Sequence, residues 1–122
     1  MVVEDDPDAA EMLCELLEQR GHQVTHAATA REGLARLREG STDAVLSDLG
    51  LPDMSGYELA RAIRDDPALK DMVLVACTGY GQRSDEERTH AAGFDAHLVK
   101  PISIEALEST LAELLRMHRS RG

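Results

Sequence analysis

Five polar groups in this sequence stand directly after short hydrophobic runs, where a strand would give way to a loop. They are the acids Glu4 and Asp5, the acid Asp48, the hydroxyl of Thr78 and the amine of Lys100. Clustered carboxylates can hold a hard divalent cation, and a carboxylate can also attack phosphorus to form an aspartyl phosphate. An amine and a hydroxyl can bind the oxygens of a phosphoryl group. Brought together, these groups could carry out phosphoryl transfer.

Asp48 occupies the position around which the rest of the chain is organised. It closes the hydrophobic run 44–47 and precedes a turn at 52–56 that contains Pro, Asp, Ser and Gly. Ligands of parallel α/β sheets bind at the carboxyl ends of the strands. An acid in that position is expected to have a chemical role, so we interpret Asp48 as a nucleophile that accepts a phosphoryl group.

The acids Glu4, Asp5 and Asp48 would repel one another if they met at one edge of a sheet. A hard divalent cation relieves that repulsion, and Mg²⁺ combines one or two carboxylates with a carbonyl, waters and a phosphoryl oxygen. Mn²⁺ accepts similar ligands and can replace it. The predicted cofactor is therefore Mg²⁺, with Lys100 and Thr78 on the other side of the phosphoryl group.

Strand and helix patterns alternate five times along the chain, and they predict the framework that brings these groups together. Strands are expected at 1–3, 23–28, 43–48, 72–77 and 96–99, and helices at 7–20, 30–39, 56–65, 84–92 and 104–115. Helical crossovers make such strands parallel and place helices on both faces of the sheet. We predict a three-layer (βα)5 flavodoxin-like fold of the α/β class, a doubly wound parallel sheet with strand order 2-1-3-4-5.

The ends of these elements carry recognisable signals. Predicted N-cap residues are Asp6, Thr29, Ser55, Ser84 and Ser103. The helix at 84–92 has a weak apolar side of Ala91 and Ala92, which predicts low local stability, and the tail 116–122 is expected to fray. Only three residues precede Glu4, against roughly five or six in a typical strand, which suggests that a residue or two is missing there.

Composition excludes several classes of function. The 122 residues suit a single domain over 1–122, and the formal net charge of −10 argues against direct binding to nucleic acid or an anionic membrane. An aromatic share of 2% leaves no stacking platform for nucleic-acid bases, and no organic cofactor is expected. No run is long enough to span a bilayer and no signal peptide is visible, so we expect a cytoplasmic protein with Cys14 and Cys77 reduced.

Four motifs in order resemble the response-regulator receiver domain, the CheY-like family of two-component signalling. They are VVEDD at 2–6, SDLGLPDMSG at 47–56, CTGYG at 77–81 and HLVKP at 97–101. The resemblance covers essentially the whole chain. It implies that Asp48 is the phosphoacceptor, that Glu4 and Asp5 position Mg²⁺, and that the backbone carbonyl of Gly50 is a further metal ligand.

The same resemblance implies that Thr78 is a switch hydroxyl and that Lys100 binds the phosphate. The phosphoryl donor would be a phosphohistidine on a sensor histidine kinase or a histidine phosphotransfer protein. The sequence does not identify the downstream effector. The chain would catalyse its own phosphorylation and dephosphorylation without turning over external substrates. Phosphorylation would switch a face made by the 84–92 helix, the 96–99 strand and the last helix.

Three positions depart from the family pattern. Glu4 stands where many members carry Asp, but Glu is a common variant and keeps the charge. Gly50 has no side chain to steer a hydrolytic water, which leaves the lifetime of the phosphoryl group open. His97 stands where the family usually has Tyr or Phe, and it can serve as the second switch residue if burial keeps it neutral. The other histidines show no metal-ligand spacing and are expected in solvent, and Asp53 is expected to serve the turn.

Three other functions fit parts of the pattern. The main alternative is a receiver-like protein-interaction module that works without phosphorylation. A flavodoxin-type redox protein would need a phosphate-binding loop after the first strand and aromatic residues around a flavin, and neither is present. A phosphatase with an Asp nucleophile would need a second acid two residues after Asp48, where Gly50 stands.

Overall fold

Five parallel strands form one sheet in the computed structural model, which describes residues 1–79 and 85–121. The strands are β1 (Val2–Val3), β2 (His26–Ala27), β3 (Ala44–Asp48), β4 (Val73–Thr78) and β5 (Ala96–Val99). The helices are α1 (Pro7–Gln19), α2 (Ala30–Arg38), α3 (Gly56–Asp65), α4 (Asp85–Ala92) and α5 (Ile104–Arg121). The strand order β2-β1-β3-β4-β5 confirms the predicted doubly wound fold.

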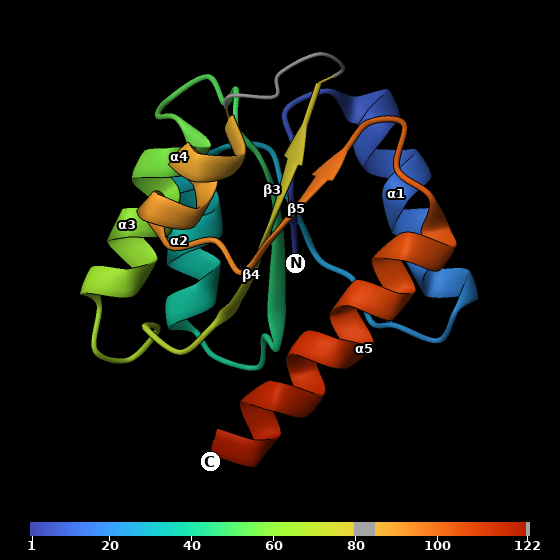
Figure 1. Cartoon of the computed structure of the whole chain (residues 1–122). Helices are drawn as coiled ribbons and strands as arrows, with labels where there is room; N and C mark the ends of the chain where they lie inside the picture. The colour runs from blue at the N-terminus through green and yellow to red at the C-terminus, as the bar shows by residue number, and fades with distance from the viewer. Residues whose placement is uncertain (80–84, 122) are drawn as a thin grey trace.

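Helices cover both faces of the sheet, with α1 and α5 on one side and α2, α3 and α4 on the other (Figure 1). Each side has its own hydrophobic core. Val2, Leu46 and Leu107 belong to the core under α1 and α5, whereas Val3 and Leu59 belong to the core under the other three helices. The interior strand β4 is buried along its whole length, as expected for a parallel strand covered on both faces.

Several predicted helix caps are present. The side chains of Asp6, Thr29 and Ser55 accept hydrogen bonds from backbone N–H groups of α1, α2 and α3, and Ser103 accepts one at the start of α5. These caps satisfy donors that have no partner within the helix. The predicted cap Ser84 lies outside the described residues.

Three local predictions were wrong. β2 covers two residues instead of six, because it is an edge strand whose ladder partner β1 is itself two residues long. α5 extends to Arg121, past the predicted end of that helix at 115. In α4, Ala91 is exposed, and the buried side of the helix is made by Thr89 and Ala92.

None of the helices in the described part of the chain combines the length and the apolar character needed to cross a bilayer.

Candidate functional site

Three acids meet at the carboxyl edge of the sheet. Glu4 follows β1 directly, Asp5 is the next residue, and Asp48 is the last residue of β3. One oxygen of each carboxylate lies within 4.8 Å of the other two, so a single cation can reach all three. Glu4 is buried, Asp48 is half-buried and Asp5 is exposed, which leaves the cluster open on one side. Hard oxygen donors with an open side fit Mg²⁺.

Lys100 inserts its ammonium between two of these acids. Its Nζ atom donates a hydrogen bond of 2.7 Å to Glu4 Oε1 and lies 3.6 Å from Asp48 Oδ2. Partial burial lowers the pKa of Lys100, but the hydrogen bond that Lys100 donates to Glu4 and the nearby charges of Asp48 and Glu4 outweigh it and raise the pKa above its ordinary value. The lysine therefore relieves part of the repulsion that the sequence prediction assigned to the cation alone.

Neighbouring residues hold Asp48 in position. Its Oδ1 atom accepts a hydrogen bond of 2.8 Å from the N–H of Leu49, and its carbonyl accepts one of 2.8 Å from the hydroxyl of Ser47. The first residue of α3, Gly56, donates to the carbonyl of Leu49 at 2.8 Å. A Cβ atom on Gly56 would lie 2.5 Å from the carbonyl oxygen of Asp48, so only glycine lets α3 approach this closely.

Thr78, the last residue of β4, forms a pair with His97 of β5. Thr78 Oγ1 and His97 Nε2 share a hydrogen bond of 2.6 Å, and Thr78 is 1% exposed. Nδ1 of His97 is buried, and no partner for it is recorded in the described chain. A buried N–H without a partner costs more than a lone pair without one, so we assign the neutral tautomer in which Nε2–H donates to Thr78. The hydrogen of the Thr78 hydroxyl then stays available for another acceptor.

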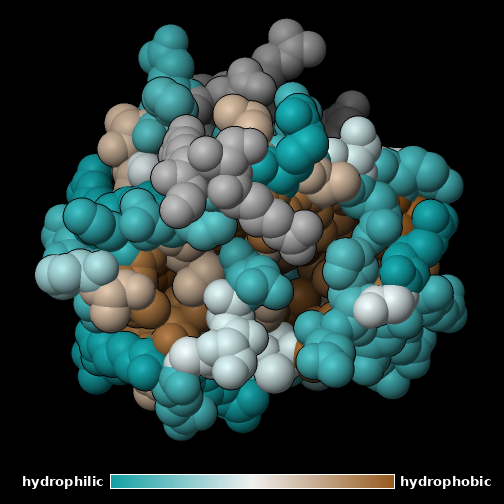
Figure 2. All heavy atoms as spheres, turned by 90° about the horizontal axis from the view of Figure 1, so that it is seen from below, coloured by the Kyte–Doolittle hydropathy of each residue, from teal (hydrophilic) through white to brown (hydrophobic). Residues whose placement is uncertain are grey.

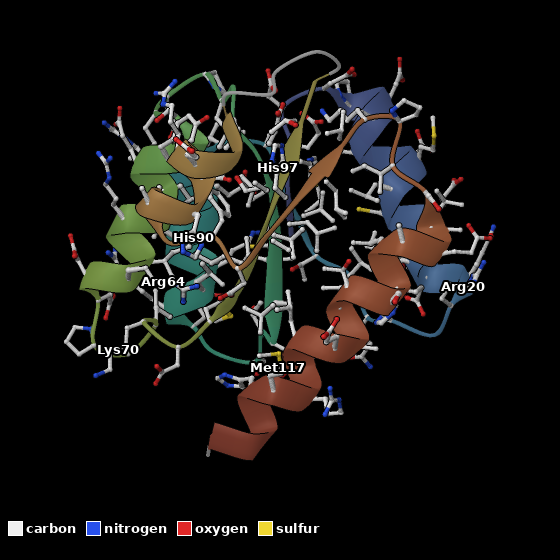
Figure 3. All side chains as sticks on the ribbon, in the orientation of Figure 1. Arg20, Arg64, Lys70, His90, His97 and Met117 are labelled. Carbon is white, nitrogen blue, oxygen red and sulfur yellow. The ribbon has the colours of Figure 1, made fainter. Side chains whose placement is uncertain are left out.

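The remaining predicted site residues lie beside this group. The peptide N–H of Lys100 donates to the carbonyl of Thr78 at 2.8 Å, which ties the end of β5 to the end of β4. Gly50 is exposed in the loop two residues after Asp48, and the role of its carbonyl as a metal ligand stays a prediction. Figure 3 labels His97 on the strand that carries this edge of the site.

Two supporting residues escaped the sequence prediction. His26, expected in solvent, is half-buried, and its Nε2 donates a hydrogen bond of 2.7 Å to the carbonyl of Glu4. Asp53, expected to serve its own turn, accepts hydrogen bonds of 2.9 Å each from the N–H groups of Ala30 and Arg31 at the start of α2. Both partners are backbone atoms of distant segments, which residue types in a sequence do not reveal.

Comparison with known proteins gives a consistent result. A family model described as the response regulator receiver domain matches residues 1–112. The chain is 31% identical to the polar-differentiation response regulator DivK of Brucella ovis, over 94% of each chain.

Solved structures agree. A CheY-like response regulator receiver domain protein of Methanospirillum hungatei is 31% identical, with a TM-score of 0.89, over 99% of this chain and 95% of the other. The signal receiver domain of a signal transduction histidine kinase of Syntrophus aciditrophicus is 32% identical, with a TM-score of 0.85, over 94% of this chain and 87% of the other.

Proposed function

This chain belongs to the response regulator receiver domain family of two-component signalling, and from that premise we propose that it accepts a phosphoryl group on Asp48 in a phosphorelay. The observation that carries the proposal is the cluster of Glu4, Asp5 and Asp48 beside the ammonium of Lys100. Acids and an amine in one open site suit a reaction in which a nucleophilic carboxylate receives an anionic group.

Glu4, Asp5 and Asp48, with the carbonyl of Gly50, are the residues that would hold Mg²⁺. When bound, Mg²⁺ supplies positive charge that neutralises the phosphoryl oxygens during transfer. The donor set is made of hard oxygens, which also suits Mn²⁺. Lys100 contributes the second positive charge, and its half-exposed ammonium can turn from Glu4 toward an incoming phosphoryl oxygen.

The proposed transfer joins one oxygen of Asp48 to phosphorus and breaks the phosphorus–nitrogen bond of a phosphohistidine. The bonding electrons leave with the imidazole nitrogen of the donor, and that ring is protonated from solvent. Asp48 Oδ1 is already held by the N–H of Leu49, so the carboxylate keeps one orientation while it reacts. The donor is a sensor histidine kinase or a histidine phosphotransfer protein, and we place the exchange in the cytoplasm.

Thr78 and His97 form the proposed switch. In the assigned tautomer the hydroxyl of Thr78 can donate to a phosphoryl oxygen on Asp48 while its oxygen still accepts from His97. A movement of Thr78 toward the phosphoryl group would pull His97 along through their hydrogen bond, and it would thereby displace β5. The face made by α4, β5 and α5 is therefore the proposed output surface.

The test is phosphorylation by a small molecule. We expect one added phosphate per chain, seen by intact-protein mass spectrometry, when the protein is incubated with Mg²⁺ and a low-molecular-weight acyl phosphate. Asp48→Asn should abolish the label, because an amide is a far poorer nucleophile. Asp65→Asn, a change at an exposed acid at the end of α3, should keep it.

Two outcomes would contradict the proposal. Full labelling of Asp48→Asn would move the acceptor to another residue. No labelling of the wild-type protein at saturating Mg²⁺ would favour the phosphorylation-independent interaction module.

A further inference from the structure

The two ends of the sheet differ in the chemistry that they offer. Figure 2 views the molecule from the amino ends of the strands and shows hydrophobic residues at the bottom of hollows between hydrophilic rims. The carboxyl ends carry polar groups instead, and the pair of Thr78 and His97 is the part of that edge that belongs to β4 and β5. His97 is the member of the pair that can change its charge, because histidines ordinarily do so between pH 5 and pH 8.

The ring of His97 lies on the α4 side of an edge strand. Ala96 and Leu98 pack against the core under α1 and α5, so alternation directs His97 to the opposite face of the sheet. β5 pairs only with β4 in the described sheet, and the residue opposite His97 is Ala76, whose side chain is a single methyl group. The ring therefore reaches past Ala76 to Thr78, and the open edge leaves it a second position in solvent.

The inward position of the ring suits only its neutral form. Nε2 shares the hydrogen bond of 2.6 Å with Thr78, and Nδ1 is buried with no partner recorded among the described residues. Protonation gives a histidine an N–H on both nitrogens, so Nδ1 would become a buried donor without an acceptor on a charged ring. That cost is larger for a charged group than for a neutral one. The charged ring would leave this position, and its bond to Thr78 would break.

The described charged groups of the neighbouring elements offer Nδ1 no acceptor. On β4, Ala76 and Thr78 share the face of His97 and neither titrates. The charged groups of α4 are exposed: Glu87, Arg88, which lies over the ring of Tyr57, and His90. Those beside the ends of β4 and β5 are paired: Asp95 with Arg64, and Lys100 with Glu4 and Asp48. The side chains of Asp85 and Glu86 lie outside the described part of the chain.

We propose that His97 makes the switch sensitive to pH. The neutral ring holds Thr78 and carries its movement to β5, whereas the charged ring turns into solvent and disconnects β5 from Thr78. The inference rests on the proposed function, because the movement that is transmitted begins with a phosphoryl group on Asp48. Phosphorylation would then alter the face of α4, β5 and α5 while His97 is neutral, and it would leave that face unchanged once His97 is charged.

The first experiment uses the unphosphorylated protein. With ¹⁵N-labelled histidine, the nitrogen chemical shifts should show His97 as the neutral Nε2–H tautomer at pH 7.5. As the pH is lowered toward 5, the appearance of the charged ring should coincide with a loss of protection against hydrogen exchange at the N–H of Lys100, which donates to the carbonyl of Thr78. After correction for the intrinsic exchange rate, we expect a loss of about fivefold or more.

The matched variant is His97→Gln. Its side-chain amide offers an N–H for the bond to Thr78 and does not take up a proton in this range, so the protection of Lys100 should stay constant between pH 7.5 and pH 5. His26→Gln changes the half-buried histidine of β2, at the opposite edge of the sheet, and should keep the pH dependence of the wild-type protein. Asp85→Asn combined with Glu86→Gln should also keep it.

The second experiment adds the phosphoryl group, with Mg²⁺ and a low-molecular-weight acyl phosphate. In the wild-type protein, labelling should change hydrogen exchange in α4 and β5 at pH 7.5, and it should not do so at a pH where the nitrogen shifts show His97 charged. In His97→Gln, labelling should change exchange at both pH values. A wild-type protein that takes no label would contradict the proposed function, and the first experiment would still decide whether protonation of His97 releases Thr78.

Three results would overturn the inference. One is an Nδ1–H tautomer of His97 at pH 7.5. Another is a charged His97 with the protection of Lys100 unchanged. The third is a pH dependence of that protection that is the same in His97→Gln as in the wild-type protein, or that disappears when Asp85 and Glu86 are replaced.

Discussion

Asp53 acts on a helix that is remote from it in sequence. It accepts two hydrogen bonds from the first turn of α2, which begins 23 residues earlier. Burial opposes its ionisation, but the N–H groups of Ala30, Arg31, Asp53 and Met54 outweigh that effect and hold the pKa of Asp53 below its usual value. The loop that follows Asp48 is thereby fixed to α2, and the position of Gly50 depends on this attachment.

The depressed pKa gives a prediction for stability at low pH. A carboxyl whose folded-state pKa is lowered contributes stability above its unfolded pKa, and the contribution is lost as the pH falls through the folded value. We expect Asp53→Asn to be less stable than the wild-type protein at pH 7, and we expect the difference to shrink below pH 3.8. Urea unfolding at pH 7, 5 and 3 measures this difference in the free energy of unfolding between the two proteins.

Asp65→Asn, at an exposed position, is the control and should match the wild-type protein at each pH. A difference for Asp53→Asn that stays constant down to pH 3 would show that ionisation of Asp53 is not what supports α2.

Single residues also show where sequence reasoning succeeds and where it stops. The meeting of Glu4, Asp48 and Lys100 was predictable, because strand ends in a parallel sheet converge at one edge. The contact of His26 with the carbonyl of Glu4 was not predictable, because its acceptor is a backbone atom that every residue carries. The same reason hid the contact of Asp53 with α2.

At the scale of elements, the junction between β3 and α3 depends on Gly56. We expect Gly56→Ala to destabilise the fold by about 1–3 kcal/mol, because the added methyl group would overlap the carbonyl of Asp48 and Cα of Leu49. Gly50→Ala adds the same methyl group where nothing lies within 4 Å, and it should change stability by less than about 0.5 kcal/mol. Equal losses in chemical denaturation would rule out the steric explanation.

Arg64 of α3 joins three segments through one side chain (Figure 3). It donates to the carbonyls of Lys70 and Met72 before β4 and to the carbonyl of Gly93 after α4, at 2.6–2.9 Å. It also pairs with Asp95, which accepts the N–H of Leu74 at 2.9 Å. α4, whose apolar side is thin, is therefore held at its end by a hydrogen-bond network as well as by packing.

This network predicts that Arg64→Lys is costly although the charge is kept. One ammonium cannot serve three carbonyls in the planar arrangement of a guanidinium, so we expect a loss of about 2 kcal/mol in urea unfolding. Arg61→Lys, on the exposed side of the same helix, should change stability by less than about 0.5 kcal/mol. If Arg64→Lys left the free energy of unfolding unchanged, water would have to replace the guanidinium at those carbonyls.

For the whole molecule, cation binding and folding are linked. Mg²⁺ at ten times its Kd should raise the free energy of unfolding by about 1.4 kcal/mol, and a chelator should reverse the gain. Because the chain carries a net charge of −10, any salt also screens self-repulsion, so NaCl of equal ionic strength is the control. In thermal unfolding, Asp5→Asn should lose most of the gain in stability that is specific to Mg²⁺. A gain as large as that of the wild-type protein would place the cation elsewhere.

The predicted and observed folds agree at this scale for a physical reason. Five alternating patterns with helical crossovers leave few topologies, and the handedness of the crossover selects among them. The lengths of β2 and α5 were less predictable. The length of β2 depends on its neighbour in the sheet, and the length of α5 depends on how far a helix continues when no helix-breaking residue ends it.

The bond between Glu4 and Lys100 joins residues that are 96 positions apart. Because translation runs from the N-terminus, β1, β3 and Asp48 are synthesised before β5 and Lys100. The ammonium that lies between Glu4 and Asp48 is therefore the last of these groups to be added. Under the proposed function, an acceptor site with both its acids and its amine exists only on chains whose last strand has been synthesised and has joined the sheet.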